Sequence, residues 1–203
     1  AIDYKLWSLW PAGYHLENIL WHTAAGILLF VFLSVILSER SESKDLGSET
    51  SDPRKNDVVA RAIAFITSLL WLIHPAHVEA VAYANSRGDS MATVFILLTL
   101  ILWMKNRIKA SAIVFILALL SKEFAIITPG LMALISFVNL TNGKFTKLPT
   151  AKLPVWTKSL FIMFSIAAVY TVLRLTVLNF QNTLNFYGAD TAKIDQTQPL
   201  ALY

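Results

Sequence analysis

The stretch that decides the fold is residues 14–37, which read YHLENILWHTAAGILLFVFLSVIL. It is a long run of apolar side chains with one acidic residue, Glu17, near its start. A helix of about 20 apolar residues is long enough to cross the roughly 30 Å hydrocarbon core of a bilayer. The stretch therefore predicts a transmembrane helix, and with it an integral membrane protein.

The composition of the chain indicates the same class. Of its 203 residues, 56% are hydrophobic and 15% are charged, whereas soluble domains carry about 25% charged residues. The sequence contains no cysteine, so disulfides and thiolate chemistry are excluded. The formal net charge of +4 is compatible either with nucleic-acid binding or with basic loops that orient a membrane protein.

Further apolar segments follow the first one. Three of them approach spanning length, at 58–73, 91–104 and 159–178. Another, 110–140, is interrupted by Ser121-Lys122-Glu123 and by Pro129-Gly130. Two full crossings need about 40 residues, so this segment is expected to form two short helices that meet at Lys122 and Glu123. The fold class is then all-α, a multi-pass transmembrane helical bundle with about six membrane segments.

A broken backbone inside a membrane has a further consequence. Non-helical backbone at that depth persists only where it contacts protein or lines a water-filled cavity. We therefore expect a polar cavity beside the break at Lys122.

The placement of Lys and Arg predicts the orientation. Twelve of the seventeen basic residues fall in or beside three short loops, namely Arg40, Lys44, Arg54, Lys55, Arg61, Lys105, Arg107, Lys109, Lys144, Lys147, Lys152 and Lys158. The positive-inside rule places these loops in the cytoplasm. The basic balance is thus attributed to topology, and no nucleic-acid partner is expected.

The polar segments between the spans complete the predicted organisation. Residues 1–203 are read as one partial transmembrane domain. The segment 38–57 is rich in Ser, Glu, Lys and Asp and is expected to be a flexible cytoplasmic loop. The segments 74–90 and 181–203 are expected to be outer loops, with 110–140 as the short helical hairpin between cytoplasmic ends.

Ionisable side chains gather at the predicted outer face. His15, Asn18 and His22 share one face of the first helix at spacings of three and four residues. The other members follow in two turns of the chain, namely His74, His77, Glu79, Arg87 and Asp89 in HPAHVEAVAYANSRGDS, and Lys122 and Glu123. Such groups are costly in membrane segments and usually face a cavity or a pathway. Their one-sided convergence predicts a shared functional site.

Each of these residues also has a purely structural interpretation. His22 and Asn18 are each compatible with a hydrogen bond to a neighbouring helix. Asp89 with Ser90 is compatible with a cap of the third helix. Glu79 with Arg87, and Lys122 with Glu123, are candidate ion pairs. For Lys122 we favour the functional interpretation, because an ammonium at a helix break is suited to binding a phosphate.

The histidines also raise the question of a metal. HPAHVE has two residues between its histidines and contains a proline, whereas a zinc-protease HExxH motif needs helical i, i+4 spacing. No protein metal site is predicted. A divalent cation held by Glu79 or Asp89 together with a substrate phosphate remains an open alternative.

Three motifs carry a resemblance to a known family. PAGYHLENILWH, HPAHVEAVAYANSRGDSMA and LLSKEFAIITPGL resemble, in order and spacing, the membrane half of the transmembrane and tetratricopeptide-repeat (TMTC) O-mannosyltransferases. The resemblance covers roughly residues 3–140. It implies a GT-C glycosyltransferase fold and an enzyme of the endoplasmic reticulum membrane or the bacterial inner membrane. The implied donor is a polyprenyl-phosphate sugar, in animals dolichyl-phosphate mannose, and the implied acceptor is a Ser or Thr hydroxyl of a protein.

The resemblance also implies roles for particular residues. His74, Glu79, Arg87 and Asp89 correspond to the outer active-site rim. The candidate catalytic residues are His74, His77, Glu79 and Asp89. Lys122 and Glu123 match the SKE motif, where the lipid phosphate is expected, with Arg87 as a further phosphate ligand. His15, Asn18 and His22 are supporting residues.

Two family features have no counterpart in this sequence. The acidic pair of the first outer loop is expected upstream, because residues 1–13 contain a single acidic residue, Asp3. The tetratricopeptide repeats are also absent from the sequence, so it is expected to be a fragment that works with further parts of the same protein or a larger complex.

Two other functions remain open from the residues alone. Broken helices with a lysine at the break are also typical of a transporter or flippase for a lipid-linked or anionic solute. A non-catalytic membrane subunit with the same fold is the other alternative.

Overall fold

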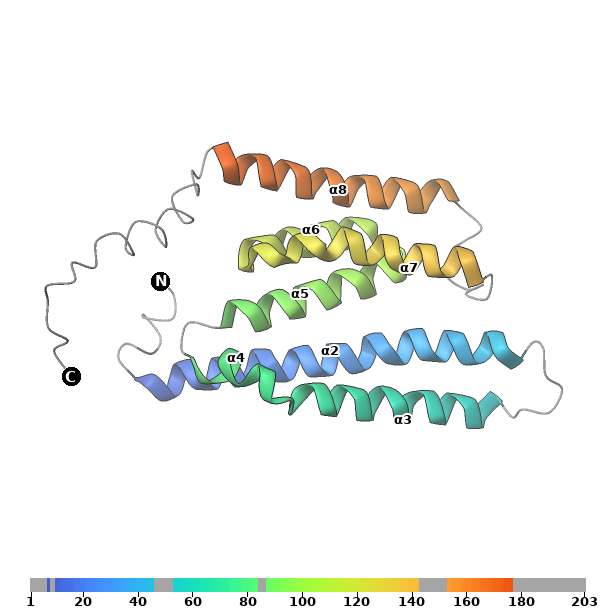
Figure 1. Cartoon of the computed structure of the whole chain (residues 1–203), viewed down its shortest axis with the longest axis horizontal. Helices are drawn as coiled ribbons and strands as arrows, with labels where there is room; N and C mark the ends of the chain where they lie inside the picture. Colours follow the sequence, from blue (N-terminus) through green and yellow to red (C-terminus); the bar gives the residue numbers. More distant parts are fainter. Residues whose placement is uncertain (1–6, 8–9, 46–52, 84–86, 143–152, 177–203) are drawn as a thin grey trace, which may run out of the picture. The chain divides into compact units, whose positions relative to one another are not determined.

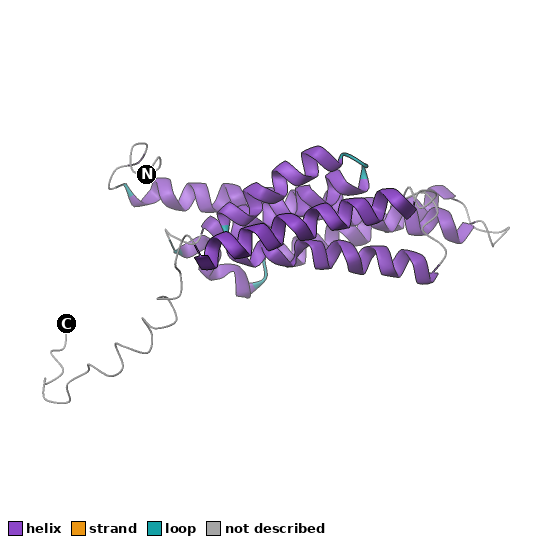
Figure 2. Ribbon diagram, turned by 90° about the horizontal axis from the view of Figure 1, so that it is seen from above, coloured by secondary structure: helices purple, strands orange, loops and turns teal. Residues whose placement is uncertain are grey.

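The computed structural model describes residue 7 and residues 10–45, 53–83, 87–142 and 153–176. Every regular element in these ranges is a helix, and none is a strand (Figure 2). The predicted all-α class is therefore confirmed. The chain divides into two units, Ala1–Phe164 and Ser165–Tyr203, which are described separately.

The first two long helices, α2 (Pro11–Asp45) and α3 (Pro53–Leu72), pack against each other (Figure 1). Both begin with proline, whose fixed φ suits the first helical position and whose missing N–H has no intrahelical partner there. A Cβ on Gly26 would lie 2.7 Å from Leu72 Cδ1, so the helices approach closely at this point. Small residues permit such contacts between membrane helices.

Three helical segments within the described residues are long and apolar enough to cross a membrane, at Pro11–Ser38, Arg87–Met104 and Thr157–Thr176. A fourth candidate is the pair Arg54–Leu72 and Pro75–Ala82, which is bent by 51°. Two shorter apolar helical segments, Ile108–Ser121 and Glu123–Val138, complete the set. The fold is that of a helical membrane bundle, as the hydropathy of the sequence indicated.

The bend after α3 has a local cause. Pro75 opens a 3-10 turn, η1 (Pro75–His77), and His74 Nδ1 accepts a hydrogen bond of 3.1 Å from the N–H of Ala76. This bond satisfies one of the free N–H groups at the start of the turn. The short helix α4 (Val78–Ala82) follows and contacts α2.

The next two helices, α5 (Arg87–Met104) and α6 (Ile108–Ser121), form an antiparallel pair (Figure 1). The turn between them contains Asn106 with φ of 57°, a left-handed conformation that asparagine adopts more readily than most residues. Ser111 Oγ of α6 donates a 2.9 Å hydrogen bond to the carbonyl of Thr99 in α5. More than half of α5 is buried, so this helix is the centre of the first unit.

The break after α6 lies at Lys122, inside the segment where a short hairpin was expected. A 3-10 turn, η2 (Glu123–Ile127), leads from it into α7 (Thr128–Asn142). Thr128 Oγ1 donates to the carbonyl of Ala125 at 2.6 Å, and Pro129 occupies the first turn of α7. At 1.5 Å per residue α6 is about 21 Å long, which is shorter than the hydrocarbon core.

The last helix is α8 (Leu153–Thr176). In the first unit, Trp103 Nε1 of α5 donates a 3.0 Å hydrogen bond to Ser159 Oγ of α8. In the second unit, Arg174 Nη1 donates to Tyr170 Oη at 3.0 Å.

Some predicted boundaries require correction. The segment 38–57, expected to be a loop, is helical up to Asp45 and again from Pro53, because the α-helices continue beyond their apolar runs. The third helix begins at Arg87 rather than after Asp89-Ser90. The predicted outer loop 181–203 lies outside the described residues. The two sides of the membrane remain a prediction from the basic loops.

Candidate functional site

Two ion pairs converge on the first turn of α5. Arg87 Nη1 lies 3.1 Å from Glu17 Oε2 of α2, and Lys122 Nζ lies 2.7 Å from Asp89 Oδ1. Arg87 and Asp89 are two residues apart, so the first turn of α5 joins the start of α2 to the break after α6. The pairs bring together three of the residues singled out in the sequence, namely Arg87, Asp89 and Lys122.

The backbone at Lys122 explains why its side chain reaches α5. Lys122 has an extended conformation (φ −156°, ψ 141°), and its N–H donates to the carbonyl of Ala118 at 3.1 Å. A Cβ on Gly88 would lie 3.4 Å from the carbonyl oxygen of Ser121 and 3.7 Å from Lys122 Cδ. The first turn of α5 therefore lies directly against the end of α6, which places the ammonium beside Asp89.

The Lys122–Asp89 pair is partly exposed. Each of the two side chains is 40% exposed. An ion pair with that exposure contributes only about 0.2–1 kcal/mol to stability, so an anion that binds Lys122 can replace Asp89 at low cost. The N-terminus of α5 adds a partial positive charge.

Glu17 is a site residue that the sequence analysis did not select. Its Oε1 accepts a 2.8 Å hydrogen bond from Trp7 Nε1, while Oε2 binds Arg87. The Trp7 ring covers Gly13, where a Cβ would approach the indole to 2.4 Å. The signal was present in the sequence, because Glu17 is the one carboxylate in the apolar run 14–37, and such groups are usually paired or functional.

Asn18 holds the turn after α3 against α2. Its side chain is fully buried, and Nδ2 donates to the carbonyls of Val81 at 3.2 Å and Tyr83 at 2.7 Å. Oδ1 is buried without a partner among the described residues. The structural interpretation of Asn18 as a link between helices is confirmed. The link also fixes α4, which carries Glu79.

Three histidines form an aromatic cluster with Trp71. His22 Nε2 lies 2.9 Å from the carbonyl oxygen of Leu72, and its ring stacks on Trp71 with centroids 5.2 Å apart. His77 lies 4.4 Å from Trp71 and 5.3 Å from His22, and His74 lies 6.1 Å from His77, between ring centroids. The predicted interhelical hydrogen bond of His22 is confirmed.

Three further predicted site residues are exposed. His15 and Glu79 are exposed on α2 and α4, and Glu123 is exposed at the start of η2. His15 is thus exposed on α2, whereas Asn18 and His22, with which it was grouped, are buried.

The coordinates decide two candidate ion pairs that the sequence left open. Arg87 pairs with Glu17, because α2 packs against α5, and not with the candidate partner Glu79. Lys122 pairs with Asp89 rather than with its neighbour Glu123, because adjacent residues point in different directions.

The described residues contain no group of three or more His, Asp or Glu side chains that could hold a metal ion. A divalent cation held by Glu79 or Asp89 together with a substrate phosphate stays an open alternative. The predicted polar cavity beside Lys122 stays a prediction.

The fold and the two ion pairs define a multi-pass helical membrane protein with a charged site at one end of α5. Comparison with known proteins specifies the family further. The chain is 34% identical over 139 residues to the protein O-mannosyl-transferase F38B6.6 of Caenorhabditis elegans, covering 68% of this chain and 18% of that protein.

Two human proteins give similar results. The protein O-mannosyl-transferase TMTC4 is 30% identical over 152 residues, covering 68% of this chain and 19% of that protein. TMTC3, which carries the same enzyme name, is 22% identical over 204 residues, covering 89% of this chain and 20% of that protein. The chain is therefore TMTC-like, and it spans about a fifth of the length of these relatives. No family model matches it. No solved structure matches it either.

Proposed function

We propose that the chain forms part of the membrane domain of a glycosyltransferase that moves mannose from a polyprenyl-phosphate donor to a protein hydroxyl. The relatives named above are called protein O-mannosyl-transferases, which supports the reaction class. The observation that carries the proposal is the partly exposed Lys122–Asp89 pair at a helix break, beside Arg87. This arrangement places two cationic side chains where they can bind a phosphate, within a largely apolar bundle.

The proposed reaction is an inverting transfer. The acceptor hydroxyl oxygen attacks the anomeric carbon, the bond from that carbon to the phosphate oxygen breaks, and the phosphate leaves with the electron pair. The hydroxyl proton passes to a carboxylate base. Negative charge develops on the leaving phosphate, so cations aimed at it stabilise the transition state more than the ground state.

Each candidate residue has a role in this scheme. Lys122 binds the phosphate of the donor, and this phosphate takes the place of Asp89 beside the ammonium. Arg87 supplies a second cationic group. Asp89, once released, and Glu79 orient the sugar. His74 and His77 are hydrogen-bond donors to the donor or acceptor.

The side of the membrane that the site faces is inferred from the positions of the basic loops. The ion pairs lie at the start of α2 and α5, whereas Lys105, Arg107 and Lys109 lie at the other end of α5. Because the positive-inside rule places basic loops in the cytoplasm, the site faces the lumen of the endoplasmic reticulum or the outer side of a bacterial inner membrane.

The test is Lys122→Met in the intact protein, with Lys105→Met as the matched control. Lys105 is exposed in the turn between α5 and α6, so its loss removes an equal charge away from the site. Transfer of labelled mannose from a mannosyl polyprenyl phosphate to an acceptor peptide is measured for both. Removing one such donor from a transition state costs about 10²–10³ in kcat, and Lys105→Met should keep the wild-type rate. Equal rates for the two variants, with both proteins folded, would contradict the proposal.

A further inference from the structure

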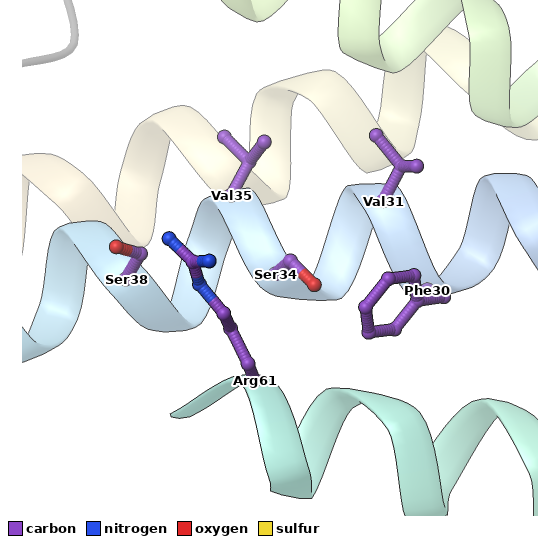
Figure 3. Close-up of a pocket in the computed structure, with 6 residues that line it drawn as sticks. All are labelled: Phe30, Val31, Ser34, Val35, Ser38 and Arg61. Carbon is purple, nitrogen blue, oxygen red and sulfur yellow. The ribbon is translucent and has the colours of Figure 1, made fainter. Parts of the chain in front are cut away.

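A separate cavity lies between α2 and α3. Its volume is about 450 Å³, and it is lined by Phe30, Val31, Ser34, Val35, Ser38 and Arg61 (Figure 3). At 1.5 Å per residue, Ser34 lies about 24 Å along α2 from Asn18. The contact of Gly26 with Leu72 lies between the two positions. The cavity is therefore distinct from the charged site at the start of α5.

The lining of the cavity changes from polar to apolar along α2. Ser38 is the last residue of the apolar span Pro11–Ser38, and Arg61 lies across from it on α3 (Figure 3). Phe30 and Val31 lie about 12 Å deeper along the helix. A membrane lipid has the same polarity, with its phosphate where apolar spans end and its chains toward the bilayer centre.

The polar end of the cavity retains hydrogen-bond donors for a ligand. Asp57 accepts from Ser38 Oγ at 2.6 Å on one carboxylate oxygen and lies 2.9 Å from Arg61 Nη2 on the other. Arg61 has five N–H donors in a fork suited to phosphate, and its side chain is 67% exposed. Ser34 Oγ is buried and has no partner within the described residues.

The first turns of α3 favour an anionic ligand, because Arg54, Lys55 and Arg61 stand there against Asp57 alone. The segment 38–52 carries two basic and five acidic residues, so the attraction is local to Arg61 and its neighbours on α3. Each basic residue near a membrane surface attracts anionic lipid by about 1 kcal/mol. A zwitterionic headgroup would gain less from the same surface.

We propose that this cavity binds one anionic phospholipid of the surrounding bilayer. The phosphate contacts the Arg61 guanidinium and the Ser34 hydroxyl, and the first part of an acyl chain contacts Phe30 and Val31. The bound lipid fills the space between α2 and α3 and holds the two helices together at this end. The proposal does not depend on the glycosyltransferase function.

The contribution of the Arg61 charge to lipid binding is tested with Arg61→Gln in the intact protein. Lys55→Gln is the matched control. Lys55 is exposed and does not line the cavity. Each protein is placed in nanodiscs with equal amounts of phosphatidylglycerol and phosphatidylcholine. It is then extracted into detergent at about 0.5 M salt, where diffuse attraction between exposed charges is screened. The retained lipid is measured by mass spectrometry.

Wild-type protein should retain phosphatidylglycerol in preference to phosphatidylcholine. Arg61→Gln should lower that retention at least about tenfold, the effect of losing a hydrogen bond to a charged group, and Arg61→Lys should restore part of it. Lys55→Gln should leave retention near the wild-type value. Equal losses for the two glutamine variants would mean diffuse surface charge and would overturn the proposal.

The shape of the cavity is tested without changing charge. Val31→Trp fills the apolar end, whereas Val59→Trp adds the same side chain to an exposed position of α3 outside the lining. The first should reduce phosphatidylglycerol retention about tenfold, because a filled cavity cannot accept the chain, and the second should not. Unchanged retention in Val31→Trp, equal retention of phosphatidylcholine, or displacement of phosphatidylglycerol by a polyprenyl phosphate would each overturn the proposal.

Discussion

The replacement Asn18→Leu tests how the site is held in place. Asn18 is fully buried and joins α2 to the carbonyls of Val81 and Tyr83. Leucine has the same number of side-chain heavy atoms in the same branching pattern, so the substitution removes both hydrogen bonds without leaving a cavity. The segment 78–83, which carries Glu79, would lose its polar attachment to α2.

The magnitude follows from the two bonds. Each intramolecular hydrogen bond contributes about 0.5–1.5 kcal/mol net, so their joint loss lowers the free energy of unfolding by about 1–3 kcal/mol. Removal of the buried, unpartnered Oδ1 of Asn18 offsets part of this cost. The effect should be local, because the lost contacts all lie in the turn after α3.

The assay is hydrogen–deuterium exchange of the intact protein in detergent, with thermal unfolding measured in parallel. Amides of residues 78–83 should exchange faster in Asn18→Leu, while those of α5 and α6 keep their rates. His15→Leu is the control, because it lies on the same helix but is exposed, and exposed substitutions usually change stability by less than about 0.5 kcal/mol. Unchanged exchange at 78–83 in Asn18→Leu would refute the proposed anchoring.

Two further predictions concern the start of α2. Glu17→Gln removes the charge that pairs with Arg87, whose side chain is 28% exposed; stability should fall by about 1 kcal/mol or less, and thermal unfolding in detergent will show whether the loss is larger. Gly13→Ala adds a Cβ that would lie 2.4 Å from the Trp7 ring, so the ring must move and lose its hydrogen bond to Glu17. The indole N–H resonance of Trp7 should therefore shift in an NMR spectrum of Trp-labelled protein. An unchanged resonance would contradict the packing described.

Most of the helix positions could be predicted from the sequence. The apolar run 14–37 corresponds to the span Pro11–Ser38, and the run 91–104 to the span Arg87–Met104. The break at Lys122 was visible because SKE interrupts an apolar stretch that is too short for two crossings. The predicted helix ends were less accurate. The helix α2 continues to Asp45 through polar residues, which a hydropathy pattern does not distinguish from a loop.

The partners of the charged residues could not be predicted in this way. Glu17 and Arg87 are 70 residues apart in the sequence, and nothing local relates them. The family resemblance selected Arg87, Asp89 and Lys122, yet it gave no indication that two of them pair with each other. Their catalytic and phosphate-binding roles remain proposals.

The sequence by itself determined that this chain is a bundle of membrane helices, and where most of those helices lie. It could do so because transfer into a bilayer depends on the hydropathy of each segment. Only the tertiary structure decided that Lys122 meets Asp89, that Arg87 meets Glu17, and that α2 and α3 separate around Arg61. These contacts depend on how closely helices approach, and small residues such as Gly26 and Gly88 set that distance by packing.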